Sequence, residues 1–222
     1  MPRAGKGGRY HHGDLRAALV DTAIEVIGER GVRGFSLAEA SRRLGVAVSA
    51  PYAHFADRDE LLAAVAVRAY EVFYAALVPE MDQFRAPADR LAAMARGYVR
   101  FAAANRPLFE VLYEAGLDKA SHPEIETAER PLTDAFMACV RALCDGCDAL
   151  AEDLGNAIEA NADGHVMLLL DGGSDQGIQA VELAAERAAR ATLALIESRH
   201  LLGQPARPPG LEAPGTEAPG TG

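Results

Sequence analysis

Apolar residues recur at three- and four-residue spacings along most of the chain, a pattern that predicts amphipathic helices. We expect a first helix that ends at Gly31, a second that begins after Ser36 with Glu39 at the capping-box position, and a short third helix over residues 47–55. Pro51 is tolerated only in a first turn, so this third helix should begin late or irregularly. The other expected helices cover residues 60–78, 88–105, 107–115, 125–143, 151–170 and 178–200.

The fold class that follows is all-α, because no segment alternates polar and apolar residues as a half-buried strand does. Alanine, the best helix former, also dominates the apolar set. We expect a flexible arm over residues 1–13, a three-helix unit over 14–58, a larger helical body over 59–202 and a disordered low-complexity tail over 203–222.

Charge is distributed unevenly over the 222 residues. The net charge is −10, yet residues 1–58 carry nine Lys/Arg against six acids. The first twelve residues hold Arg3, Lys6 and Arg9 and no acid. A basic arm ahead of an acidic body suggests contact with nucleic acid, and a solvated, disordered terminus is the alternative explanation.

The sequence argues against a membrane protein, a secreted disulfide-rich protein and an enzyme. No apolar run approaches the ~18 residues of a membrane span, and no segment near the start resembles a secretory leader. The three cysteines cannot close a disulfide framework, so we expect a cytoplasmic protein. The chain has no Gly-rich phosphate loop, nucleophile elbow or paired-histidine metal motif, so we expect neither an enzyme nor a cofactor.

Three short helices with a break at Gly45 between the second and third have the proportions of a helix-turn-helix unit. In such a unit the last helix enters the major groove, and its early residues face the base edges. Helix lengths alone do not distinguish this unit from an ordinary bundle of three short helices.

The residues across this unit resemble the DNA-binding domain of the TetR family of transcriptional regulators. The resemblance is carried by SLAEA (36–40), RRLGV (42–46), PYAHF (51–55) and DRDELL (57–62). It implies a helix-turn-helix DNA-binding domain over 14–58 and a ligand-binding and dimerisation domain over 59–202. The implied function is a homodimeric repressor that binds a palindromic double-stranded DNA operator and is released by a small-molecule effector.

One branch of the family is similar in two further stretches, YHHGDLR (10–16) and YVRF (98–101). The C-terminal domain of that branch is named for a Trp-His-Gly signature. In this chain Glu159 and Asp163 stand where the signature's Trp and His would fall, and only Gly164 is kept. Two carboxylates in place of two rings put an inherited ligand in doubt and suggest a cationic or polyhydroxylated effector, unless both carboxylates lie exposed on the helix surface.

Carried over position by position, the resemblance places the recognition helix at residues 47–54. Base contacts would come from Ser49, Ala50 and the apolar Val48, and no Arg, Asn or Gln is present there for bidentate readout. Specificity should therefore depend on DNA shape, with phosphate contacts supplying most of the affinity. The full set of expected DNA-binding residues is Ser36, Leu37, Ala47, Val48, Ser49, Ala50, Tyr52, His54 and Arg58, with Arg9 from the arm.

Two further sites are expected in the body. Small and apolar residues repeat along the last helix, which in this family contributes to a four-helix dimer interface; packing within one subunit is the alternative. The expected dimer residues are Ile178, Val181, Ala185, Ala188, Thr192 and Leu195. The residues expected to line an effector cavity, or else to form plain core, are Phe73, Tyr98, Phe101, Phe109, Tyr113, Glu159, Asp163 and Met167.

Cys139, Cys144 and Cys147 follow the spacing C-x4-C-x2-C. A thiol- or metal-responsive regulator on the same scaffold is therefore one alternative function, and inert thiols are the simpler interpretation. No metal site is assigned. A helical small-molecule-binding protein that has lost DNA binding is the other alternative.

Overall fold

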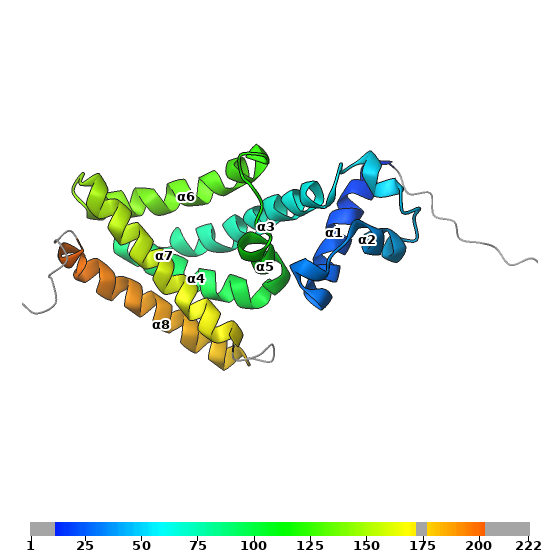
Figure 1. Cartoon of the computed structure of the whole chain (residues 1–222). Helices are drawn as coiled ribbons and strands as arrows, with labels where there is room; N and C mark the ends of the chain where they lie inside the picture. Colours follow the sequence, from blue (N-terminus) through cyan, green and yellow to red (C-terminus); the bar gives the residue numbers. More distant parts are fainter. Residues whose placement is uncertain (1–11, 172–176, 203–222) are drawn as a thin grey trace, which may run out of the picture.

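The computed structural model describes residues 12–171 and 177–202, and this part of the chain is built from helices and turns alone (Figure 1). The α1–α2 unit lies at one end of the molecule, and helices α4–α8 form the body at the other end. The helices are α1 (His12–Arg30), α2 (Leu37–Leu44), α3 (Arg58–Met81), α4 (Pro87–Ala104), α5 (Arg106–Glu114), α6 (Pro123–Leu143), α7 (Asp148–Asp171) and α8 (Ile178–Glu197). Short 3₁₀ turns are η1 (Val32–Gly34), η2 (Ala50–Ala53) and η3 (Arg199–Leu201).

The N-terminal unit begins earlier than expected. Helix α1 is already formed at His12, two residues before the three-helix unit was expected to begin. The helix ends where predicted, at Gly31, whose φ of 69° is the left-handed conformation that glycine adopts without strain. Ser36 caps α2 as predicted, because its hydroxyl oxygen accepts a hydrogen bond from the Glu39 amide at 3.3 Å. The basic arm and the tail from residue 203 lie outside the described residues.

The expected third helix over residues 47–55 is replaced by a single 3₁₀ turn, η2. Pro51 explains the difference, since its ring would clash with the carbonyl of Ala47 in an α-helix that begins there. The chain turns instead: the Ala50 amide bonds the Ala47 carbonyl at 2.9 Å, and the His54 amide bonds the Pro51 carbonyl at 2.9 Å. The segment after α2 is therefore a compact, irregular turn.

Helix α3 runs from the N-terminal unit into the body and so connects the two ends of the molecule (Figure 1). Asp57 caps it as predicted, with its carboxylate accepting from the Glu60 amide at 2.9 Å. Among the described helices, α3 is the one long and apolar enough to cross a membrane, with a mean hydropathy of 1.7, which corrects the expectation that no segment approaches such a span. In the fold this apolarity has another use, because Leu61, Val65 and Leu77 are fully buried in the core.

The N-terminal unit and the body share one hydrophobic core. A single buried cluster runs from Leu19 and Ile27 of α1 through α3 to Leu108 of α5 and Leu132 of α6. Where α1 approaches α5, a Cβ placed on Gly28 would lie 3.0 Å from Cγ of Pro107. The unit that carries η2 is therefore packed directly on the helices of the body.

Candidate functional site

The η2 turn and the residues before it present the predicted DNA-contacting side chains on the surface. Val48 and Tyr52 are 55 % and 58 % exposed, which is unusual for large apolar or aromatic side chains. Ala47 and Ser49 are also exposed, and Ala50 and His54 are half-buried. The structure thus brings these six residues together on one turn between α2 and α3.

Two other residues of the predicted set serve the fold instead. Leu37 is 6 % exposed and belongs to the core, so its side chain cannot reach DNA. The guanidinium of Arg58 donates to the Val32 carbonyl at 2.6 Å and to the Phe35 carbonyl at 3.3 Å. Arg58 was expected to contact DNA, but in the structure its side chain fastens the start of α3 to the η1 turn. Arg9 lies outside the described residues.

A buried carboxylate organises α2, and the sequence reasoning missed it. Glu39 is 5 % exposed and forms ion pairs with Arg30, Arg42 and Arg43, while Arg43 also forms a bidentate pair with Glu29. Burial alone would raise the pKa of Glu39, but the Arg43 hydrogen bond and the charges of Arg30 and Arg42 lower it overall. The capping-box position could have signalled this residue, since three arginines lie within four residues of it or at the end of α1.

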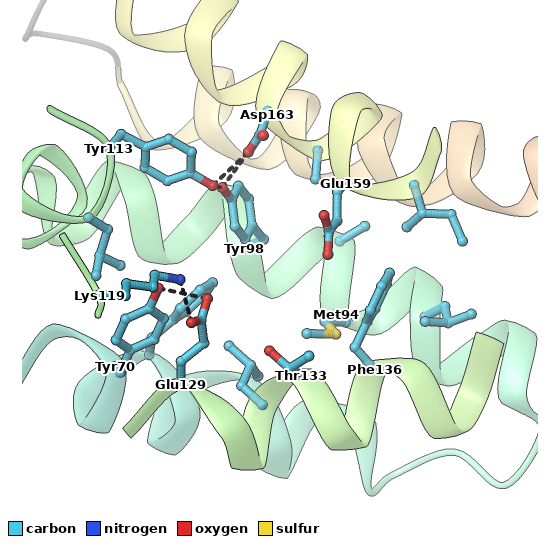
Figure 2. Close-up of a pocket in the computed structure, with 17 residues that line it drawn as sticks. Tyr70, Met94, Tyr98, Tyr113, Lys119, Glu129, Thr133, Phe136, Glu159 and Asp163 are labelled. Carbon is cyan, nitrogen blue, oxygen red and sulfur yellow. Dashed lines mark hydrogen bonds and ion pairs between the residues drawn. The ribbon is translucent and has the colours of Figure 1, made fainter. Parts of the chain in front are cut away.

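The body contains a cavity of about 320 Å³ between α3, α4, α5, α6 and α7 (Figure 2). Five residues of the predicted effector set line it: Phe73, Tyr98, Tyr113, Glu159 and Asp163. The sequence reasoning missed the lining residues Tyr70, Met94, Lys119, Glu129, Thr133 and Phe136. Tyr70 had a readable signal, because it precedes Phe73 by three positions on the same buried helix.

Three residues of the predicted set lie elsewhere. Phe101 and Phe109 are buried core residues behind the cavity wall, stacked on Phe73 at 4.4 Å and on Tyr113 at 4.5 Å between ring centroids. Met167 is 42 % exposed and does not line the cavity. For Phe101 and Phe109 the alternative of plain core therefore holds, and Met167 lies outside the lining of this cavity.

Two tyrosines converge on Asp163 on one side of the cavity (Figure 2). The hydroxyl of Tyr113 donates to Asp163 Oδ1 at 2.9 Å, and the Tyr98 hydroxyl contacts both Asp163 and Tyr113. Burial, followed by the neighbouring hydroxyl and carboxylate, raises the pKa of Tyr98, and burial together with Asp163 raises the pKa of Tyr113. Both phenols therefore stay protonated and donate hydrogen bonds to Asp163.

A second polar cluster closes the opposite side. Glu129 of α6 accepts a hydrogen bond from the Tyr70 hydroxyl at 3.0 Å and forms an ion pair with Lys119, which lies in the turn between α5 and α6 (Figure 2). Burial and then the charge of Glu129 raise the pKa of Tyr70. The lysine at the cavity is thus neutralised by Glu129.

Glu159 has a different environment from the other carboxylates. It lies on α7 one turn before Asp163, its side chain points into the cavity, and it has no hydrogen bond or ion pair among the described residues (Figure 2). Burial, then the charges of Asp163 and Glu129, raises its pKa. Both interpretations hold in part, since Glu159 and Asp163 line the cavity while Glu159 is also exposed to solvent and Asp163 is half-buried.

The predicted dimer residues of α8 pack mainly within the chain. Ala185, Ala188 and Thr192 are 0 % exposed, and Asn161 of α7 donates to the Ala188 carbonyl at 3.0 Å and to the Thr192 hydroxyl at 3.1 Å. Small side chains let α8 approach α4 and α7 closely, which corrects the assignment of these three residues to a contact between subunits. The remaining predicted dimer residues are the half-buried Val181 and Leu195 and the exposed Ile178.

The three cysteines are free thiols. Cys139 and Cys144 are buried and Cys147 is exposed. Cys144 and Cys147 share the tight turn between α6 and α7, closed by a 2.9 Å hydrogen bond from the Cys147 amide to the Cys144 carbonyl. Across residues 12–171 and 177–202, no three His, Cys, Asp or Glu side chains are grouped as a metal site.

Two family models match this chain, one over the N-terminal unit and one over the body. A family model described as "Bacterial regulatory proteins, tetR family" matches residues 19–65, and one described as "Tetracyclin repressor-like, C-terminal domain" matches residues 91–198. No curated protein matches the sequence.

Solved structures share the fold. A Rhodococcus sp. RHA1 protein of unknown function is 29 % identical over 84 % of this chain and 97 % of its own, with a TM-score of 0.64. The TetR family regulator PfmR from Thermus thermophilus is 18 % identical over 80 % of this chain and 96 % of its own, with a TM-score of 0.60. AibR, solved with isovaleryl coenzyme A and operator DNA, is 16 % identical over 81 % of this chain and 96 % of its own, with a TM-score of 0.59.

The two family matches cover the helix-turn-helix unit and most of the body, and the fold agrees with that of the solved regulators. The chain therefore belongs to the TetR family of bacterial transcriptional regulators.

Proposed function

We propose that the chain is a repressor that binds a palindromic operator as a homodimer and is released from DNA by a small-molecule effector. One observation carries this proposal: a single helix, α3, is fastened to the DNA-binding unit at its first residue and lines the cavity at its middle. Arg58 makes the fastening, and Tyr70 and Phe73 line the cavity. At 1.5 Å per residue, Tyr70 and Phe73 lie about 20 Å along the helix from Arg58.

A second connection runs through α5. Tyr113 at the end of this helix lines the cavity, and Pro107 near its start touches α1 beside Gly28. An effector that displaces Tyr113 or Phe73 therefore moves elements on both sides of the DNA-binding unit. A shift in the separation of the two η2 turns of a dimer would lower the population that fits the operator, a coupling typically worth about 1–3 kcal/mol.

The proposed DNA contacts come from the exposed turn. Tyr52 and His54 donate to phosphates, Ser36 adds its hydroxyl at the start of α2, and Val48 contacts a thymine methyl. Ala47, Ser49 and Ala50 approach the base edges. Direct base readout by this set is small, so we propose that DNA shape supplies much of the specificity.

We assign the dimer contact to the outward face of α7 and α8. Ala160, Gly164 and Leu168 are exposed at four-residue spacing on α7, and Leu168 is 76 % exposed. A Cβ at Gly164 would meet no atom within 4 Å, so the centre of this face is open. Leu183 of α8, 49 % exposed, extends the apolar surface. Small residues flanked by large apolar ones suit close helix packing between two copies.

Selection of bound fragments from a random DNA pool at about 150 mM salt tests the proposal, because screening there weakens non-specific attraction. We expect a palindromic site with half-sites about one helical turn apart. Failure to enrich any sequence, with and without reductant, would contradict the proposal and favour a helical binding protein that has lost DNA recognition.

A thiol-responsive regulator is the second candidate, favoured by the turn that holds Cys144 and Cys147 between two cavity-lining helices. Hydrogen peroxide would oxidise the two thiols to a disulfide, with water as the reduced product. If peroxide changes operator affinity in the native chain and not in Cys147→Ser, this candidate gains support. An equal response in both chains would contradict it.

A further inference from the structure

The cavity provides an apolar, aromatic surface for a small ligand. Its volume of about 320 Å³ is near the lower end of small-molecule pockets, which span roughly 300–1,000 Å³. Phe73, Tyr98 and Phe136 present rings to it, and Leu91 and Ile158 are among the aliphatic residues of the wall. A compact hydrophobic molecule fits this lining better than a sugar or a nucleotide, both of which would need many more polar partners.

The charges at the cavity do not balance. Its lining holds four ionisable charges, on Lys119, Glu129, Glu159 and Asp163. Lys119 pairs with Glu129, so Glu159 and Asp163 remain without a cation among the described residues. The two are one helical turn apart, and the charge of Asp163 disfavours ionisation of Glu159.

This surplus of negative charge discriminates between classes of ligand. A carboxylate or phosphate ligand would be repelled by two carboxylates in a partly desolvated space. A cation would be attracted by the same charges.

The aromatic groups add to the preference for a cation. Tyr98 packs beside Phe73 with 5.3 Å between ring centroids, and the hydroxyls of Tyr98 and Tyr113 both contact Asp163. These aromatic residues line the same cavity as Glu159 and Asp163, and aromatic faces attract a positively charged group at distances up to about 6 Å.

We propose that the effector is a hydrophobic organic cation, an alkyl or arylalkyl amine or quaternary ammonium compound, and this inference rests on the proposed function of the cavity. The ammonium group lies between Glu159 and Asp163, and the apolar part lies against Phe73, Tyr98 and Phe136. Binding supplies the counter-charge that Glu159 lacks.

Isothermal titration calorimetry of the full chain tests this with three probes of nearly equal shape. These are 4-phenylbutylamine, 4-phenylbutan-1-ol and 4-phenylbutyrate, which are cationic, neutral and anionic at neutral pH. We expect the amine to bind about tenfold or more tightly than the alcohol, a difference of about 1.4 kcal/mol, and the acid to bind weakest. An equal or tighter affinity for the acid would overturn the proposal, as would the absence of binding by the amine.

Two variants locate the charge that matters. Glu159→Gln keeps the shape of the side chain and should reduce amine affinity about tenfold while leaving alcohol affinity unchanged. Asp153→Asn is the matched control, because Asp153 is exposed on the same helix and outside the cavity lining, and it should leave amine affinity unchanged. Equal affinities of Glu159→Gln and the native chain for the amine would overturn the assignment.

This titration contains no DNA, so its failure is distinct from failure of the proposed repressor function. Repeating it with the selected operator separates the two. Amine binding that releases DNA supports both proposals. Amine binding without release supports the cation site and contradicts effector-controlled repression.

Discussion

Replacing Arg58 with alanine tests whether this residue serves the fold or contacts DNA. The guanidinium bridges the Val32 carbonyl at 2.6 Å and the Phe35 carbonyl at 3.3 Å, and its carbon lies 6.0 Å from the centre of the Phe35 ring. A hydrogen bond to a charged group generally contributes about 1.5–3 kcal/mol. The side chain is 36 % exposed and its bond to Phe35 is long, so each of the two hydrogen bonds should contribute less than this general range suggests. We therefore expect Arg58→Ala to lower the free energy of unfolding by about 2 kcal/mol.

Urea unfolding followed by far-ultraviolet circular dichroism measures this loss. Arg58→Lys should recover only part of it, because an ammonium cannot bridge two carbonyls as a planar guanidinium does. Arg33→Ala is the control; Arg33 is exposed and has no ion pair in the described part of the chain, so its removal should change stability by no more than about 0.5 kcal/mol.

Operator binding supplies the result that would refute this reasoning. A phosphate contact contributes close to one unit to the slope of log affinity against log salt concentration. If Arg58→Ala leaves the unfolding free energy unchanged and reduces that slope by about one, then Arg58 contacts DNA and the structural assignment fails.

Four further predictions concern the DNA contact, the dimer and the cavity. Tyr52→Ala should weaken operator binding at least about tenfold without changing the dimer, with Tyr52→Phe intermediate in a fluorescence-anisotropy titration; unchanged affinity would remove η2 from the DNA interface. Leu168→Glu should give a folded monomer in sedimentation analysis, whereas Leu201→Glu, at a site 56 % exposed, should remain dimeric; a dimer in both would place the interface elsewhere. Asp163→Asn should lower the raised pKa of Glu159, as read from the pH titration of its side-chain carbon by nuclear magnetic resonance, because a neighbouring negative charge is removed. The raised pKa also affects the free energy of unfolding. A carboxyl whose pKa is higher in the folded than in the unfolded state stabilises the fold at low pH, and this contribution is lost as pH rises through the folded-state pKa. Glu159→Gln should therefore reduce the loss of stability between acid and neutral pH.

Most helix boundaries could be predicted because the residues that begin and end a helix act locally. Gly31, Ser36 and Asp57 act within one turn of their own positions, through a left-handed φ or a cap hydrogen bond. The third helix failed for an equally local reason, because a proline at position 51 cannot follow Ala47 by four residues inside an α-helix. Local rules of this kind need no knowledge of the rest of the chain.

The sites were harder because they depend on partners distant in sequence. A repeat such as Ala185, Ala188 and Thr192 indicates close packing but does not say whether the neighbour is α4 of the same chain or a second copy. The size of Phe101 and Phe109 suggested a cavity wall, but only tertiary orientation shows that both are core. Lys119 enters the cavity from a turn, where periodicity gives no information.

The core shared by α1, α3 and α5 limits how such a regulator can be re-engineered. In this chain α5 lies so close to α1 that a Cβ at Gly28 would be 3.0 Å from Cγ of Pro107. A chimera that joins this DNA-binding unit to a foreign body at the start of α3 would replace that fitted α5 with a different one. It would also separate Leu19 and Ile27 from the side chains that bury them. We therefore expect that an exchange of the DNA-binding unit keeps the proposed response to an effector only if the facing surface of α5 is transferred with it.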